Sequence, residues 1–342
     1  MKKLPILILT IFTVLFFAVS CGSTPAASDE SPAPAATTTP ASTPPASTPA
    51  TPAPAATTPT PAPESTPKQA APVPAALISQ NNGISTSKVG QYEVYMLVDA
   101  ERDGNLGIIP GASDAIVKQY IPASGFKHST NFSLIKAPGQ NILVDTGFGN
   151  TIIDKLDKLG IKPEQINTIF LTHLHGDHIG GLLKDGQPLF PNAKVYLNNK
   201  EYDYFTKTAP DKGAVAALGA YGSNVITFDA LPPGPILNEI VPGVCPIACY
   251  GHTPGHTAYL IGKGRDRFII AGDFLHIALI QFPHPEISTT YDMDQSAAAA
   301  SRVQILHYAA LHNYPIAGMH IVYPAIGTVK ADGNGFKFTP LK

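Results

Sequence analysis

Apolar residues recur in short runs separated by polar turns from about Ile84 to the end of the chain. The turn pair Pro138 and Gly139 separates two of these runs, which predicts that they form two strands joined at this turn. In all, the runs predict strands at 92–98, 132–135, 141–144, 168–172, 193–197, 225–228, 258–261 and 268–271.

Two segments have the spacing of helices. One is expected at 150–159, where Gly160 ends it, and the other runs from an N-cap at Asp294 to about His312. Strands interleaved with helices predict an α/β fold, and the ordered part, 84–342, has the size of a single globular domain.

The chain begins with a segment typical of export signals. Lys2 and Lys3 precede an almost wholly apolar run, and Ala-Val-Ser-Cys at 18–21 resembles the lipobox of bacterial lipoproteins. We therefore predict a signal peptide at 1–20 and a lipid on Cys21, which would make the protein an extracytoplasmic, membrane-anchored lipoprotein of the periplasm or cell surface. An ordinary cleaved signal peptide and an uncleaved anchor helix are the alternatives, although the run is short for a helix that spans a bilayer.

Between Cys21 and the domain lies a segment of low complexity. Most of 21–83 is Pro, Ala, Thr and Ser, which bury too little apolar surface to offset the entropy of ordering. We predict a disordered tether that lifts the domain off the membrane. A linker whose length serves no function would have the same composition.

Composition and charge limit the kinds of partner that the protein can bind. The chain is 44% hydrophobic and 14% charged with a net charge of −2, which allows a sizeable core and gives no electrostatic basis for binding nucleic acid. Three cysteines exclude a disulfide framework as the organising principle. Cys245 and Cys249 would lie about 13 Å apart on a straight strand, too far to bridge, so we expect two buried thiols.

A cluster of metal-ligand residue types directly follows the predicted strand at 168–172. His173, His175, Asp177 and His178 fall within this one short segment, and imidazole and carboxylate suit zinc and other first-row divalent ions. Because residues two apart in extended backbone point to the same side, His173 and His175 can reach one ion. Asp177 and His178 would face a neighbouring ion. The alternative is a polar loop with coincidental histidines.

Further candidate ligands follow later strand-like runs. His252 and His256 lie in the segment Gly-His-Thr-Pro-Gly-His, Asp273 ends a strand, and His320 follows another apolar run. Polar side chains at strand ends are where α/β sheets collect their sites.

The order of these motifs resembles the metallo-β-lactamase superfamily, whose early Asp-Thr-Gly element also matches Asp145–Gly147. The resemblance implies an αββα sandwich of two mixed sheets flanked by helices. It also implies two divalent metal ions, most naturally zinc, bound by the superfamily's ligand set: His173, His175 and His252 for one ion, Asp177, His178 and His320 for the other, and Asp273 for both. In the same pattern His256 packs beside the site or supports a ligand, and Asp145 either orients a ligand or stabilises its own turn.

Within the superfamily the chain is most similar to methyl parathion hydrolases, with N-acyl homoserine lactonases more distant. The segments that carry this similarity are 281–283, 290–294, 317–320 and 324–327. True β-lactamases usually lack the bridging carboxylate. The resemblance also suggests a homodimer.

The implied activity is hydrolysis of a small-molecule ester, lactone or organophosphate by a hydroxide that bridges the two metals. Asp177 would be the catalytic proton carrier. A mononuclear-iron redox enzyme, such as a sulfur dioxygenase, and a non-catalytic zinc-binding lipoprotein are the alternatives. Several aromatic residues belong either to the substrate pocket or, as we expect for most, to the core: Tyr120, Phe126, Tyr204, Phe205 and Phe282.

Overall fold

The computed structural model describes residues 75–342, so the predicted signal peptide, Cys21 and most of the predicted tether lie outside the described residues. The ordered chain begins earlier than the predicted boundary at Ile84. Strand β1 (Ala75–Asn81) pairs antiparallel with β2 (Ile84–Val89). Ala75 and Leu77 pack against the core. This strand is mostly exposed and buries no side chain fully, and the range 21–83 is corrected at its C-terminal end.

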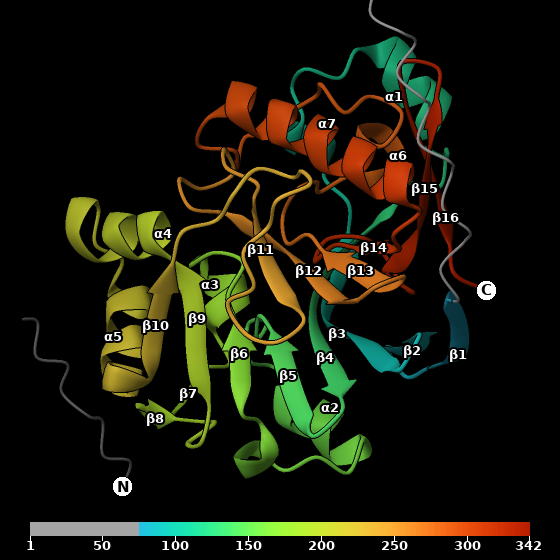
Figure 1. The fold of residues 1–342 in the computed structure, drawn as a ribbon. Helices are drawn as coiled ribbons and strands as arrows, with labels where there is room; N and C mark the ends of the chain where they lie inside the picture. Colours follow the sequence, from blue (N-terminus) through green and yellow to red (C-terminus); the bar gives the residue numbers. More distant parts are fainter. Residues whose placement is uncertain (1–74) are drawn as a thin grey trace, which may run out of the picture. The chain divides into compact units, whose positions relative to one another are not determined.

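Two mixed sheets form the centre of the domain (Figure 1). The first has eight strands in the order β1-β2-β3-β4-β5-β6-β9-β10, and the second has six, β11 to β16 in sequence order. The remaining strands of the first sheet are β3 (Tyr92–Asp103), β4 (Lys127–Ala137), β5 (Gln140–Val144), β6 (Thr168–Phe170), β9 (Lys194–Asn198) and β10 (Val225–Phe228). Those of the second are β11 (Val244–Ala248), β12 (Thr257–Lys263), β13 (Asp266–Ile270), β14 (Ile316–Ala317), β15 (Ile326–Asp332) and β16 (Gly335–Pro340). A small separate hairpin is formed by β7 (Leu183–Lys184) and β8 (Gln187–Pro188).

Helices cover the outer faces of both sheets. Those on the first sheet include α2 (Ile152–Lys158) and α5 (Lys212–Tyr221), whereas α7 (Gln295–His312) packs on the second, away from the first (Figure 1). The alternation along β3 shows the layering, because Val94 and Met96 join the core between the sheets and Tyr95 and Leu97 join the core under the helices. The predicted αββα sandwich is confirmed. Shorter helices are α1 (Asp114–Tyr120), α3 (Gly176–Ile179), α4 (Asn199–Asp203) and α6 (Ala278–Gln281).

Several local predictions agree with the observed elements. Strands β4 and β5 form the expected antiparallel hairpin, and the Asp294 side chain caps α7 by accepting a hydrogen bond from the Ala297 amide at 2.9 Å. Cys245 and Cys249 are buried free thiols, as expected.

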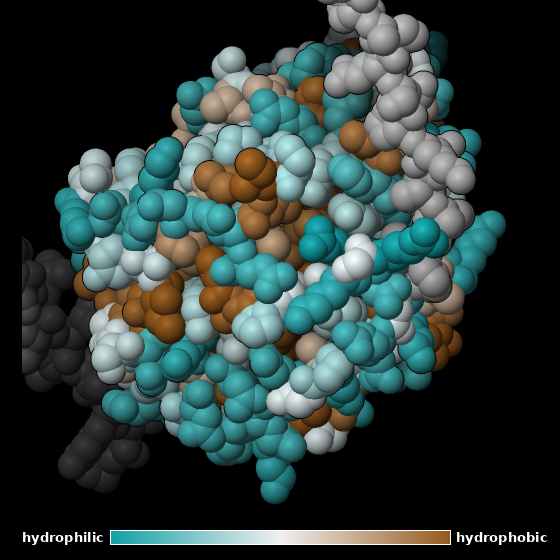
Figure 2. All heavy atoms as spheres, viewed as in Figure 1, coloured by the Kyte–Doolittle hydropathy of each residue, from teal (hydrophilic) through white to brown (hydrophobic). Residues whose placement is uncertain are grey.

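The surface facing the viewer in Figure 2 is mostly hydrophilic, with separate patches of apolar residues. Exposed large apolar side chains include Val215, Ile236 and Leu311, which lie on α5, in the loop after β10 and on α7. Within residues 75–342, no helix combines the length and apolar character needed to cross a bilayer.

Candidate metal centre

The candidate ligands stand on loops that leave the ends of strands in both sheets. His173 and His175 follow β6 and lead into α3, His252 follows β11, Asp273 follows β13 and His320 follows β14. Strands β13 and β14 are parallel neighbours, so Asp273 and His320 emerge at the same edge of the second sheet. Overlapping groups of ligand atoms within 4.8 Å of one another include all seven sequence-predicted ligands: His173, His175, Asp177, His178, His252, Asp273 and His320.

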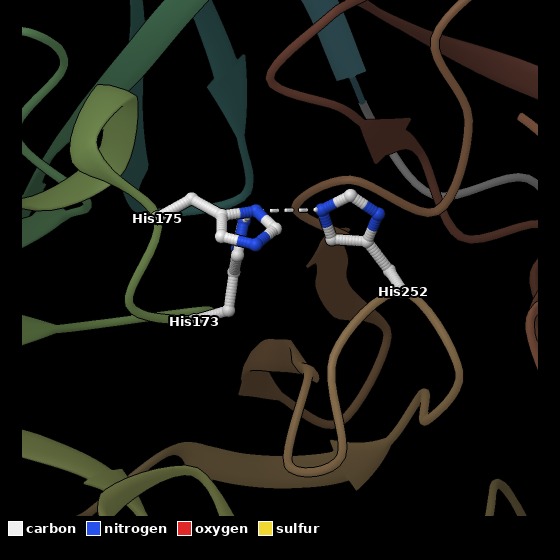
Figure 3. A group of neighbouring side chains, drawn as sticks. All are labelled: His173, His175 and His252. Carbon is white, nitrogen blue, oxygen red and sulfur yellow. Dashed lines mark hydrogen bonds between the residues drawn. The ribbon is translucent and has the colours of Figure 1, made fainter. Parts of the chain in front are cut away.

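The first group joins two loops that are far apart in the sequence. The His175 Nδ1 atom lies 3.0 Å from His173 Nε2 and 3.1 Å from His252 Nε2 (Figure 3). The three rings therefore converge on one point.

The second group consists of Asp177, His178 and His320, and Asp273 lies between the two groups. Its Oδ1 atom is 3.2 Å from His178 Nε2, and its Oδ2 atom is 2.9 Å from His320 Nε2. The same Oδ2 atom is 3.4 Å from His252 Nε2 in the first group. Asp273 is therefore in the position of a bridging carboxylate.

Hydrogen bonds on the far side of the rings set which nitrogen faces the cluster. An imidazole that donates its Nδ1–H to an acceptor keeps the lone pair of Nε2 for a cation. Three rings have such an acceptor: His178 has Asp145 Oδ2 at 2.8 Å, His252 has Asp292 Oδ1 at 3.1 Å, and His320 has the Ser129 carbonyl oxygen at 2.8 Å. The Nε2 atoms of these three rings therefore face the cluster, an arrangement that fits a metal ion.

Unpaired buried atoms and the pKa values of the side chains also bear on whether the cluster fits a metal ion. His178 Nε2 and Asp273 Oδ1 are buried and have no hydrogen-bond partner, which is costly unless a cation satisfies them. Burial holds the pKa of His173 well below its ordinary value, so this ring is neutral, as a metal ligand must be. Burial also opposes the charge of His178 and His320, but Asp273 raises the pKa of both above the ordinary value, so without a cation these two rings hold protons that a metal would displace. Burial opposes the charge of Asp273 too, but His178 and His320 hold its pKa well below its ordinary value.

Hydrogen bonds also fix the loops around the cluster. Asp145, at φ +57°, accepts hydrogen bonds from the Thr172 amide at 2.8 Å and the Thr172 hydroxyl at 2.7 Å, in addition to His178. It therefore fixes the orientation of the His178 ring. His256 faces the Cys249 carbonyl oxygen with Nδ1 and accepts the Asp273 amide at Nε2, so it supports Asp273 and belongs to none of the ligand groups.

Sequence reasoning missed two buried histidines beside the cluster. The Nε2 atom of His276 lies 3.3 Å from Asp273 Oδ2, and this ring forms a further candidate ligand group with His252 and Asp273. His128, in β4, packs its ring 4.7 Å from that of His320, and neither of its nitrogens has a partner. The place of His276 three residues after Asp273 was the only available signal, and nothing in the sequence marks His128.

The cluster forms the floor of an open cavity of about 450 Å³. Phe148 and Tyr291 line it, and the sequence predicted neither as a pocket residue. Of the five aromatic residues that it did single out, Phe205 and Phe282 are buried in the two large cores, as expected. Tyr204 packs against the core that contains Phe205. Tyr120 and Phe126 pack against a smaller third cluster of apolar residues.

Comparison with known proteins agrees with this architecture. A profile of the metallo-beta-lactamase superfamily matches residues 125–320. An N-acyl homoserine lactonase of Bacillus cereus is 29% identical over 155 residues, which are 45% of this chain and 56% of the lactonase, so the chain spans little more than half of that relative. Anti-Pycsar protein Apyc1 of Saccharibacillus brassicae is 35% identical over 195 residues, covering 56% of this chain and 73% of that protein.

Two solved structures are similar over most of the domain. One is AbOPH, a hydrolase of the beta lactamase superfamily, with a TM-score of 0.69 and 26% sequence identity. The match covers 77% of this chain and 99% of the AbOPH chain. AidC, a dizinc quorum-quenching lactonase, has a TM-score of 0.67 at 26% identity, covering 76% and 98%. The superfamily match includes every residue of the candidate metal centre, and the chain therefore belongs to the metallo-beta-lactamase superfamily.

Proposed function

We propose that this protein is a hydrolase that uses two divalent metal ions, most naturally zinc, to cleave a small-molecule ester, lactone or phosphotriester. The observation that carries the proposal is the position of Asp273 between two groups of inward-facing donors at the floor of an open cavity. In this proposal His173, His175 and His252 hold one ion, and Asp177, His178 and His320 hold the other. Asp273 contributes to both.

When bound at such a site, two divalent ions acidify water and polarise a carbonyl or phosphoryl oxygen. The chain supplies a proton carrier beside them. The side chain of Asp177 is 23% exposed, lines the cavity and lies 3.6 Å from His320 Nε2. Burial would raise the pKa of Asp177, but His178 and His320 lower it below its ordinary value, so the group is ionised and has a free carboxylate oxygen for the proton that it would carry to a leaving group.

The cavity supports a small, partly apolar substrate. Phe148 and Tyr291 provide apolar walls, and Arg102 provides a cation at the same cavity. The names of the relatives point to lactones first, because a lactonase occurs both among the similar sequences and among the similar structures. Esters and phosphotriesters present the same electrophilic centre bonded to a leaving oxygen.

Metal analysis combined with a substrate panel tests the proposal. The purified domain should hold close to two zinc-like ions per chain and hydrolyse at least one of an aryl ester, a lactone and a phosphotriester. His173→Ala should lose metal and activity, whereas His307→Ala, at an exposed position on α7, should lose neither. One iron per chain without hydrolysis would favour the redox alternative and reject the proposal, and absence of bound metal would reject both.

A further inference from the structure

A buried carboxylate lies beneath the metal centre without belonging to it. Glu201 is in the first turn of α4, is 0% exposed, and is absent from every candidate ligand group among the described residues. Burying a carboxylate is costly, and it occurs in proteins where the charge or the two acceptor oxygens are needed. All three donors that Glu201 faces are uncharged.

Both oxygens of Glu201 bind loops that carry ligands. Oε1 accepts the amide of Leu174 at 2.9 Å, and Leu174 is the residue between His173 and His175. Oε2 accepts the hydroxyl of Thr253 at 2.7 Å, and Thr253 directly follows His252. One carboxylate therefore joins the loop after β6 in the first sheet to the loop after β11 in the second.

The second loop is packed onto α4 so closely that only glycine fits. Gly255 donates its amide to Glu201 Oε2 at 2.9 Å, and a Cβ atom at this position would lie 2.2 Å from the Glu201 amide nitrogen. The contact is thus made by the backbones as well as by the carboxylate. An amide side chain could not replace the carboxylate, because its NH₂ group would face an N–H or O–H donor.

We propose that Glu201 is a positioning residue that holds His173, His175 and His252 in register as one metal site by clamping their two loops together. The inference rests on the proposed function in that it takes these three residues as ligands. Glu201 itself touches neither metal nor substrate. Removing such support from metal ligands typically lowers metal affinity about 10–100-fold.

The clamp predicts a defect confined to one of the two metal sites. In Glu201→Gln, titration with zinc against a competing chelator should show one site weakened about 10–100-fold and the other unchanged. The cobalt-substituted variant should lose or shift the visible absorption of one ion and keep that of the other. Glu164→Gln, at an exposed position, is the matched control and should leave both affinities and the spectrum unchanged.

Thr253→Val is a second test if Glu201→Gln does not fold. It removes one donor at a fully buried position with little change in volume and should weaken the same site in the same direction, by less. Unchanged affinities and an unchanged cobalt spectrum in a folded variant would overturn the clamp. Wild-type protein that binds no metal would instead reject the proposed function, so the two failures are distinguishable.

Discussion

At the scale of single residues, the metal centre depends on side chains whose protonation is set by their neighbours. Histidines that have acceptors at Nδ1 face the cluster with Nε2, and Asp273 stays ionised among them. Of the two carboxylates among the donors, Asp177 is 23% exposed and Asp273 is 2% exposed. Asp177 is therefore the carboxylate that substrate and water can reach.

Asp177→Asn should lower kcat about 100- to 1,000-fold, because an amide cannot accept the proton of water. The measurement is kcat for the best substrate of the panel at saturating metal, with metal content determined in parallel. Asp157→Asn, at an exposed position on α2, is the control and should match wild type. A variant with two metals and full activity would exclude Asp177 as the proton carrier.

Glu201 should make the stability of the metal-free domain depend on pH. Burial raises its pKa from 4.5 to about 7. Between these values the folded protein holds a proton that the unfolded chain has lost, so the free energy of unfolding falls as pH rises and levels off above about 7. The contribution is at most about 3 kcal/mol.

Urea unfolding of metal-free wild type and Glu201→Gln from about pH 5 to about pH 8 measures this contribution. The advantage of the wild type over the variant should shrink as pH rises, since all other titrating groups are common to both. Parallel pH profiles for the two proteins would mean that Glu201 does not titrate in this range.

At the scale of elements, α7 is positioned against the metal centre by its first residues. The Asp294 side chain caps the helix, and its amide donates to the carbonyl of Gly251, the neighbour of His252. A Cβ atom at Gly251 would lie 2.0 Å from the amide nitrogen of Ala298, so the loop and the start of the helix are in backbone contact.

Asp294→Ala should therefore lower the free energy of unfolding by about 1 kcal/mol, the usual loss for an N-cap. Chemical denaturation of the metal-free protein measures it, with Gln304→Ala on the exposed side of α7 as the control. A loss no larger than that of the control would show that the cap contributes nothing to stability.

The sequence was most informative about the elements that bury continuous apolar runs. Strands β3 to β6, β9, β10, β12 and β13 were predicted, as was α7, because Asp294 marks its start. No bounds were predicted for β2, β11, β14, β15 and β16, although these strands also contribute to the core between the sheets. Strand β1 was missed because its apolar run is short and does not alternate with polar residues, and α5 because Ala and Gly dominate its sequence. The seven candidate ligands were visible as local motifs after strands. Glu201 and His128 were not, because only folding brings them to the site: Thr253 lies 52 residues from Glu201.

At the scale of the whole molecule, we propose that the domain is held at a membrane by a lipid on Cys21, as the sequence predicts. Cys21→Ser should release the protein from the membrane fraction and abolish incorporation of labelled fatty acid, whereas the nearby Ser23→Ala should do neither. A Cys21→Ser protein that stays in the membrane fraction would favour an uncleaved anchor helix.

The spread of the ligands along the chain has a consequence for how the protein acquires its metals. The first candidate ligand in the chain is His173 and the last is His320. The Nδ1 atom of His320 lies 2.8 Å from the carbonyl oxygen of Ser129, which is 191 positions earlier in the chain. Such non-local contacts form late in folding, so the full set of donors exists only once β14 has joined its sheet. A chain exported unfolded, as its proposed signal implies, meets its metals in the compartment where it folds. Because N and O donors bind several divalent ions in a fixed order of affinity, the metal supply of that compartment would decide which ions the proposed sites hold.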